Sequence, residues 1–190
     1  MRKSFLTQIQ LFMKKILTII IAGCMLVCAL PAMAQRPGKM FSAGFGIEGG
    51  APLNDAKDAY NFTFGVTARV AVHAGPGFAT FTTGGIMFVA KNIDQSTLKA
   101  TVQIPFKVGY KYIIMDHFFV MGELGYSALQ TYYDNGNGDG NLAHTSTGGF
   151  TYAPSVGVQF RAMELALRYE TVHANSANLS YLALRLGFNF

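Results

Sequence analysis

Residues 179–190, LSYLALRLGFNF, alternate large apolar side chains with small or polar ones and end on Phe190. A period of two is typical of a β-strand with one apolar and one polar face. Leu182, Leu184 and Leu186 share one face, and Arg185, the single charged residue of the stretch, lies on the other. The stretch therefore predicts a strand that separates an apolar environment from a polar one.

The same alternation recurs through the rest of the chain, so that eight strands are predicted. They cover residues 40–50, 60–73, 78–90, 98–113, 118–130, 150–161, 164–173 and 179–190. No run after Leu30 reaches the roughly 18 apolar residues that a membrane helix needs. No helix is expected after the N-terminal segment, and Pro105 and Pro154 are expected to mark bulges or strand ends.

The connections between these strands alternate in length. Longer ones cover 51–59, 91–97, 131–149 and 174–178, and tight turns cover 74–77, 114–117 and 162–163. Outer-membrane barrels have this asymmetry, with short periplasmic turns, longer extracellular loops and at least eight strands. The sequence thus predicts an all-β, eight-stranded, antiparallel, up-and-down transmembrane barrel with both termini in the periplasm.

The charged residues of the strands all fall on the face opposite the apolar one. They are Glu48, Arg69, Lys99, Lys107, Lys111, Glu123, Arg161, Glu164, Arg168, Glu170 and Arg185. An Arg or Lys that faces lipid at mid-membrane costs about 2–4 kcal/mol, so we expect these side chains inside. Eight strands leave an interior just wide enough for side chains, which predicts ion pairs that plug it rather than an ion-selective lining.

The apolar face is also compatible with a soluble barrel of the lipocalin kind. However, the polar face carries mainly Gly, Ser and Thr, and charged residues make up 13% of the chain, against about 25% in soluble domains. Tyrosines lie near the predicted strand ends, where a headgroup-level position is expected. They are Tyr60, Tyr110, Tyr112, Tyr132, Tyr133, Tyr152, Tyr169 and Tyr181. Strand 78–90 is ambiguous by one register.

The N-terminal segment has the features of a secretory leader. Lys14 and Lys15 precede an apolar run over 16–30, and Ala32 and Ala34 form an A-x-A cleavage site. Cleavage after Ala34 makes residues 1–34 a signal peptide and residues 35–190 the barrel domain, whichever of Met1 and Met13 is the start. A lipoprotein signal at Cys24 is the alternative, but the apolar run continues past it.

Charge gives no support to a nucleic-acid partner. The formal net charge is +5, yet four of the fifteen basic residues lie in the leader, which has no acid. The mature balance is 11 − 10 = +1. Both cysteines also lie in the leader, so the mature chain has no disulfide framework and no thiol ligand.

Three segments together resemble a known family. They are Ile104–Tyr112 (IPFKVGYKY), Phe118–Gly125 (FFVMGELG) and Leu182–Phe190 (LALRLGFNF), and they resemble the outer-membrane β-barrel domain family, related in shape to the OmpA and OmpX barrels. The resemblance implies an outer-membrane location, contact with lipid and lipopolysaccharide, and delivery to the barrel-assembly machinery. It also implies that Phe188 and Phe190, in the terminal strand, act as the insertion signal.

Motifs that could carry chemistry are weak. His173 and Ser176 resemble the His-x-Ser arrangement of outer-membrane deacylases, but one extra residue separates them and no acid follows Ser176. Residues 135–140 (NGNGDG) resemble the start of a calcium loop but lack its bidentate Glu. The four histidines have no ligand spacing, so no metal or other cofactor is expected.

The sequence therefore favours a monomeric structural or surface-interaction protein whose longest loop, 131–149, meets an extracellular ligand. A narrow passive channel and a lipid A-modifying hydrolase are the alternatives.

Overall fold

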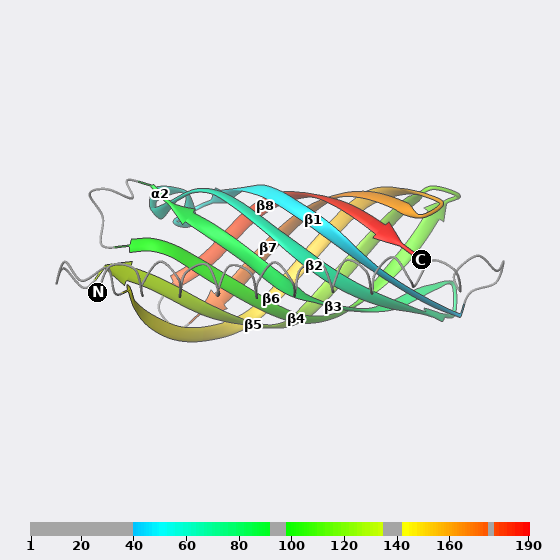
Figure 1. The fold of residues 1–190 in the computed structure, drawn as a ribbon. Helices are drawn as coiled ribbons and strands as arrows, with labels where there is room; N and C mark the ends of the chain where they lie inside the picture. Colours follow the sequence, from blue (N-terminus) through cyan, green and yellow to red (C-terminus); the bar gives the residue numbers. More distant parts are fainter. Residues whose placement is uncertain (1–39, 92–97, 135–141, 175–176) are drawn as a thin grey trace, which may run out of the picture. The chain divides into compact units, whose positions relative to one another are not determined.

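The computed structural model describes residues 40–91, 98–134, 142–174 and 177–190. Within them, residues 40–189 form a closed barrel in which each strand pairs antiparallel with its neighbours in the sequence (Figure 1). The strands are β1 (Phe41–Leu53), β2 (Tyr60–Ala74), β3 (Gly77–Ala90), β4 (Leu98–Met115), β5 (Phe118–Asp134), β6 (Leu142–Phe160), β7 (Met163–Ala174) and β8 (Ala177–Asn189). The predicted eight-stranded up-and-down barrel is confirmed. The predicted leader, with Ala32 and Ala34, lies outside the described residues.

Pairing between the first and last strands closes the barrel. The β1–β8 register runs from Gly44 opposite Asn189 to Leu53 opposite Ser180. Phe188, in the proposed insertion signal, lies opposite Phe45 and is 41% exposed; Phe190 directly follows β8. Because β8 pairs with both β7 and β1, neither end of the sheet remains an open edge along this stretch.

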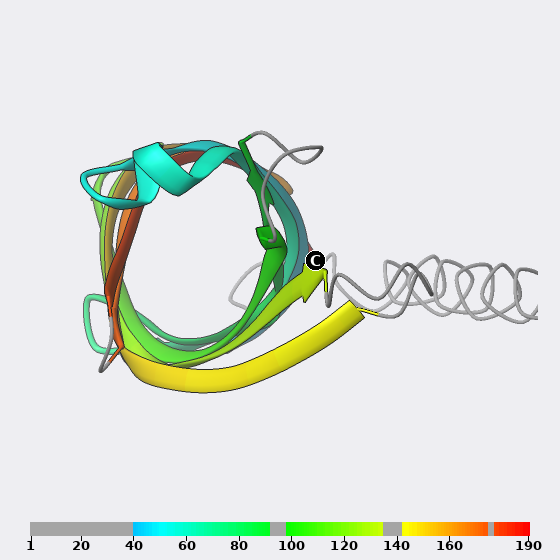
Figure 2. The same cartoon turned by 90° about the vertical axis from the view of Figure 1, so that its left-hand side faces the viewer.

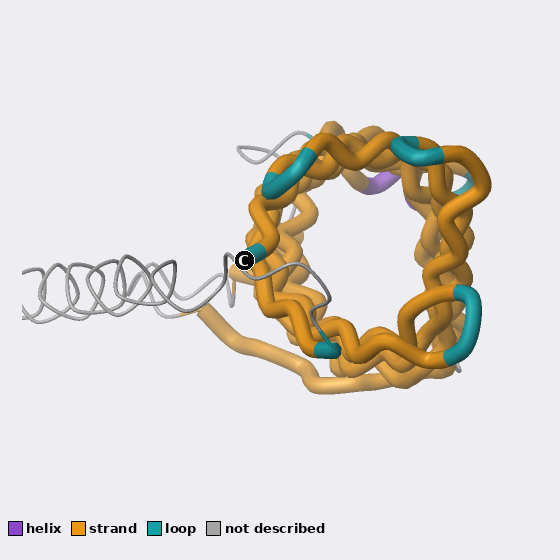
Figure 3. The backbone as a smooth tube through the Cα atoms, turned by 90° about the vertical axis from the view of Figure 1, so that its right-hand side faces the viewer, coloured by secondary structure: helices purple, strands orange, loops and turns teal. Residues whose placement is uncertain are grey.

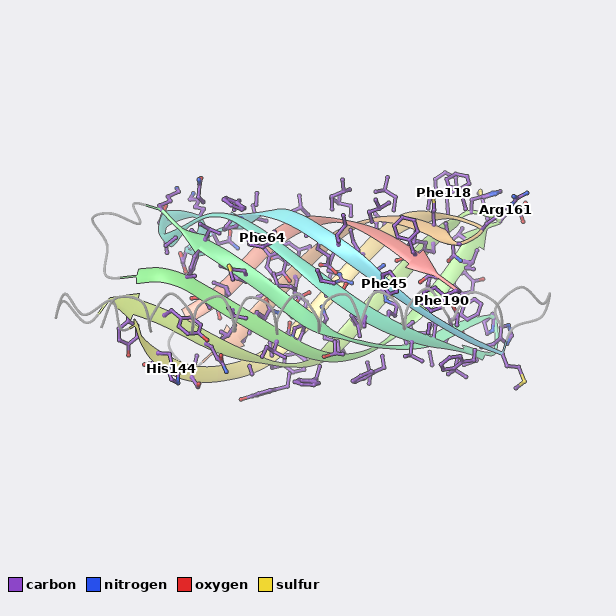
Figure 4. All side chains as sticks on the ribbon, in the orientation of Figure 1. Phe45, Phe64, Phe118, His144, Arg161 and Phe190 are labelled. Carbon is purple, nitrogen blue, oxygen red and sulfur yellow. The ribbon has the colours of Figure 1, made fainter. Side chains whose placement is uncertain are left out.

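The two faces of the sheet differ as the period of two predicts. In β7, Glu164 and Arg168 are buried, whereas Leu165 and Leu167 point outward and are exposed. The outer surface is rich in large apolar side chains, which stand out from the ribbon in Figure 4. In β3, Thr80 and Thr82 point inward with Ile86 and Phe88, which settles the register that the sequence left open.

The rims also differ. Two-residue connections join β2 to β3, β4 to β5 and β6 to β7 at one end, shown as teal turns in Figure 3. The opposite rim carries the longer connections and a one-turn helix, α2 (Ala56–Ala59), which was not expected. Among the described residues, no helix has the length and apolar character needed to cross a membrane. The expected alternation of connection lengths holds for three of the four loops. The fourth, expected over 174–178, is wrong, because β7 extends to Ala174 and β8 begins at Ala177, which leaves a connection as short as the turns.

The segment expected as the longest loop, 131–149, is mostly strand, so this expectation was wrong. Strands β5 and β6 continue as a hairpin whose register extends to Asp134 opposite Leu142. The first part of β6 lies outside the ring formed by the other strands, in yellow in Figure 2. Thr145 and Thr147 have the β-branched side chains that suit strands, so this stretch forms a strand despite its polar composition.

Pro105 and Pro154 lie within strands, contrary to expectation. Pro105 keeps Ser127 of β5 opposite it, and Pro154 keeps Gly122 of β5. The register shifts of the sheet lie elsewhere, for example between Ile113 and Met115. The nitrogen of each proline, which has no hydrogen, therefore faces one neighbouring strand, and pairing with the strand on the other side continues in register.

A pair of glycines in β5 offers a test of this packing. A Cβ at Gly125 would meet the carbonyl oxygen of Phe106 in β4, whereas a Cβ at Gly122 would meet nothing within 4 Å. We expect Gly125→Ala to destabilise the barrel by about 1–3 kcal/mol, as overpacking does. Gly122→Ala should leave it unchanged. Samples of each variant are heated to increasing temperatures and run on a denaturing gel, and the temperature at which the band of the folded barrel disappears is recorded. Equal temperatures for the two variants would contradict the close β4–β5 approach.

Candidate functional site

The barrel interior holds most of the charged side chains that were expected there. Nine of them are buried, none more than 5% exposed: Glu48, Arg69, Lys107, Lys111, Glu123, Glu164, Arg168, Glu170 and Arg185. The side chain of Lys99 lies outside the described residues. The interior therefore presents a dense set of acids and bases contributed by six of the eight strands.

Arg161 does not belong to this set, and its expected position was wrong. It lies in the connection between β6 and β7, is exposed, and has a φ of 50°. The commonest two-residue connections between antiparallel strands have positive φ at one or both central residues. Arg161 therefore belongs to the turn and not to the strand. Figure 4 shows Arg161 and Phe118 at the turn end of the barrel.

Three arginines and three glutamates form a closed ring of alternating charge, here called the charge ring. Each arginine lies within ion-pair distance of two of the glutamates. The six links are Arg69 Nη1–Glu164 Oε1 (2.6 Å), Glu164 Oε1–Arg185 Nη1 (2.7 Å), Arg185 Nε–Glu48 Oε1 (3.5 Å), Glu48 Oε1–Arg168 Nη1 (2.8 Å), Arg168 Nη2–Glu123 Oε2 (3.1 Å) and Glu123 Oε2–Arg69 Nη2 (3.7 Å). The charge ring connects β1, β2, β5, β7 and β8 across the interior.

Threonine hydroxyls add hydrogen bonds to the charge ring. Thr67 donates to Glu48 (2.8 Å) and accepts from Nε of Arg185 (3.2 Å). Thr82 accepts from Nε of Arg69 (3.1 Å) and donates to Glu123 (2.5 Å). Buried charges are costly unless their hydrogen-bonding groups are satisfied, so these hydroxyls stabilise the ring.

Glycine makes the space for the largest of these side chains. Gly46 of β1 lies opposite Gly187 of β8, and a Cβ at Gly46 would lie 2.7 Å from Cζ of Arg185. A Cβ at Gly187 would also meet the guanidinium. Gly46 and Gly187 thus leave the space that the Arg185 side chain occupies. The narrow interior has no room for a guanidinium and two further side chains at this level.

Two lysines extend the charge ring. Lys107 pairs with Glu170, whose other oxygen accepts a hydrogen bond from Gln103 (2.6 Å). Lys111 donates to Glu164 (2.5 Å) and lies 4.0 Å from the centre of the Phe119 ring. Within the described interior, five cations face four carboxylates, a difference of +1.

Two apolar clusters accompany these charges in the interior. Toward the loop rim, the ring of Phe88 packs edge-on between Tyr60 (5.4 Å between centroids) and Tyr181 (5.2 Å). Ala56 of α2 and Leu129 of β5 belong to the same cluster. This cluster is here called the apolar plug. A smaller cluster of Phe119, Met121 and Ala166 lies at the level of the charge ring, since Ala166 is opposite Arg185 and Met121 is opposite Lys111.

The apolar plug corrects the headgroup position expected for Tyr60 and Tyr181, both of which are buried inside the barrel. The sequence did contain a signal for one of them. Tyr181 and Arg185 are four residues apart in one strand and therefore share a face. Tyr60 donates or accepts a hydrogen bond with Thr101 (2.6 Å), which satisfies its hydroxyl inside the barrel.

His173, from the hydrolase-like motif, and Glu170, the acid three residues before it, lie on opposite faces of the sheet. Glu170 is buried in the interior, whereas the His173 side chain is exposed, and Nδ1 of His173 lies 2.8 Å from Oδ1 of Asn178. Ser176 and the calcium-like segment 135–140 lie outside the described residues. In the part of the chain that is described, no three His, Cys, Asp or Glu residues could together hold a metal ion.

The charge ring can be tested through Glu48, which links Arg168 and Arg185. We expect Glu48→Gln to lower the free energy of unfolding by about 3–5 kcal/mol, because it removes one of the four buried carboxylates that face five buried cations. The control is Arg161→Gln at the exposed turn, which should change it by no more than about 0.5 kcal/mol. Urea titration of the protein in lipid vesicles, followed by gel mobility without heating, measures both. Similar midpoints for the two variants would show that the ring does not stabilise the barrel.

Comparison with known proteins agrees with this geometry. The chain is similar in structure to Ail, the attachment invasion locus protein of Yersinia pestis, with a TM-score of 0.57 and 12% identity over 79% of this chain and 97% of that one. It is also similar to the N-terminal β-barrel domain of Pseudomonas aeruginosa OprF (TM-score 0.58, 9% identity, 78% and 97% covered). A third similar structure is Neisserial surface protein A (TM-score 0.53, 12% identity, 81% and 98% covered).

At these identities the solved structures show a common fold. A comparison with the sequences of curated proteins gives no match. The family model described as "Outer membrane protein beta-barrel domain" matches residues 20–190. The chain is therefore a member of the outer membrane protein β-barrel domain family and is a protein of the outer membrane.

Proposed function

We propose that this protein is a non-enzymatic, non-conducting barrel that acts at the cell surface. The observation that carries the proposal is the filled interior, in which the charge ring links five strands and the apolar plug lies between this ring and the loop rim. A sealed interior leaves the rim outside the membrane as the part that meets other molecules.

A passive channel is less well supported by the interior. An eight-stranded barrel has an interior just wide enough for side chains. Here Arg168 and Arg185 are fully buried, each bonded to carboxylates on other strands. The apolar plug, with Phe88 and Tyr181 fully buried, would have to part before a hydrated ion could pass. A route for ions would therefore break buried ion pairs and wet an apolar layer, both at a cost in free energy.

The β5–β6 hairpin is the surface element that we assign to this role. Short turns face the periplasm in this class of barrel, so the rim with α2 and the hairpin faces outward. His144 lies at this end in Figure 4. Ail, of similar fold, was solved in complex with the heparin analogue sucrose octasulfate, which supports a ligand-binding role for small barrels. The extracellular ligand of the present chain would meet the hairpin at 131–149.

The rest of the proposal concerns biogenesis. Residues 1–34 would direct secretion and be removed after Ala34, with Ala32 at the cleavage site. The barrel-assembly machinery would read the terminal strand through Phe188 and Phe190. The protein would then reside as a monomer among lipid and lipopolysaccharide.

Conductance tests the central part of the proposal. Protein refolded into a planar bilayer should show no steady conductance, because the charge ring and the apolar plug fill the interior. The matched variant Phe88→Ala/Tyr181→Ala removes the two fully buried rings of the plug and should raise the frequency of brief openings. Discrete, long-lived openings of the native protein, altered in size by Arg185→Gln, would contradict a sealed interior and favour the channel.

A further inference from the structure

The first part of β6 is a strand with a partner on one side only. The β5–β6 register continues without a break from Phe118 opposite Val158 to Asp134 opposite Leu142. The β6–β7 register begins only at Gly149 opposite Ala174. Among the described residues, therefore, no strand pairs with the second side of residues 142–148, here called the free edge (Figure 2).

Pro154 shows which backbone groups this edge presents. Pro154 remains opposite Gly122 of β5, whereas the β6–β7 pairs lapse between Tyr152 and Ser155. The nitrogen that lacks a hydrogen therefore faces β7. Backbone groups in an antiparallel strand alternate sides with a period of two. The N–H and C=O groups of residues 144, 146 and 148 therefore point to the side that β7 leaves empty, and those of 145 and 147 point to β5.

The free edge lacks the features that normally prevent strand addition. Natural sheets protect an edge with charged side chains, prolines or bulges. Residues 142–148 contain no Asp, Glu, Lys, Arg or Pro, and the β5–β6 register has no shift there. The side chains of residues 144–147 are exposed. An unprotected edge that a stable hairpin holds in the extended conformation is a template for another strand.

Side-chain contacts hold the hairpin on its other side. The hydroxyl groups of Tyr133 and Thr145 are 2.5 Å apart, and the rings of Tyr132 and His144 pack with their centroids 6.0 Å apart. Both contacts join β5 to β6, so they stabilise the strand without occupying the backbone groups of the free edge. The template is preorganised, which lowers the entropic cost of binding.

We propose that the free edge binds an extended segment of a partner polypeptide, which adds to β6 as a further strand of the sheet. The proposal rests on the proposed function in one respect, because the hairpin must face outside the cell to meet a foreign chain. Recognition is by main-chain hydrogen bonds, so the partner is defined by an extended, proline-free backbone. The edge carries no formal charge, so charge does not select the partner.

The test uses the full-length mature protein in nanodiscs and a fluorescent peptide of alternating threonine and valine with a lysine at each end. Binding is measured by fluorescence anisotropy. Ser146→Pro and, independently, His144→Pro should weaken binding at least tenfold, because each removes a donor on the free edge but none from the β5–β6 ladder. Ser146→Ala, the matched control, should bind like the native protein. The peptide N-methylated at its two central amides should not bind.

Amide hydrogen exchange gives a second readout, because a general change in the stability of the hairpin would not protect alternate residues. Peptide addition should slow exchange at residues 144 and 146 and leave residues 145 and 147, already bonded to β5, unchanged. Heat-dependent gel mobility of each variant shows that its barrel is folded. Absence of peptide binding, unaltered binding to both proline variants, or protection at 145 and 147 instead would overturn the proposal. If the protein self-associates and Ser146→Pro abolishes this, the free edge binds a second copy of the chain, which also overturns the proposal.

The same preparations separate this proposal from the function on which it rests. If the barrel shows no conductance and binds no peptide, the strand-addition proposal is overturned and the proposal of a sealed interior stands. If the barrel conducts and binds peptide through residues 144 and 146, the proposal of a sealed interior is overturned and the strand-addition proposal stands.

Discussion

The structure depends on the pairing of β1 with β8. A bilayer offers no hydrogen-bonding partner to a backbone N–H or C=O group, so a sheet can span it only when no edge remains. The ladder from Gly44 opposite Asn189 to Leu53 opposite Ser180 meets this requirement. Closure with eight strands also sets a narrow interior, and this width dictates which side chains can occupy it.

The charge ring follows from that width. Five buried cations and four carboxylates cannot reach water, so each must find its counter-charge on another strand. Glu48 of β1 meets Arg168 of β7, 120 positions away, and Arg185 of β8 rests against Gly46. Acids, bases, threonines and glycines on the inner face therefore form one structure. The outer face, in contrast, carries mainly large apolar side chains.

Much of the fold was predictable because its determinants are local. Alternation along each strand indicated the eight strands and their two faces, and the short turns indicated the antiparallel order. Errors arose where local pattern and tertiary context differ. Arg161 continues the strand pattern but is needed in a turn with positive φ. Thr145 and Thr147 look like loop residues but pair with β5. Tyr60 and Tyr181 look like interfacial residues but pack against Phe88.

The sequence by itself determined the number of strands, the two faces of most of them and the inward direction of nine of the charges. These follow from a period of two and from the unfavourable transfer of charge into lipid. Only the tertiary structure decided which arginine meets which glutamate, where the apolar plug lies, and that β6 extends past β7 with one side unpaired. Such features depend on the register between strands distant in the sequence, and alternation within a single strand carries no information about that register.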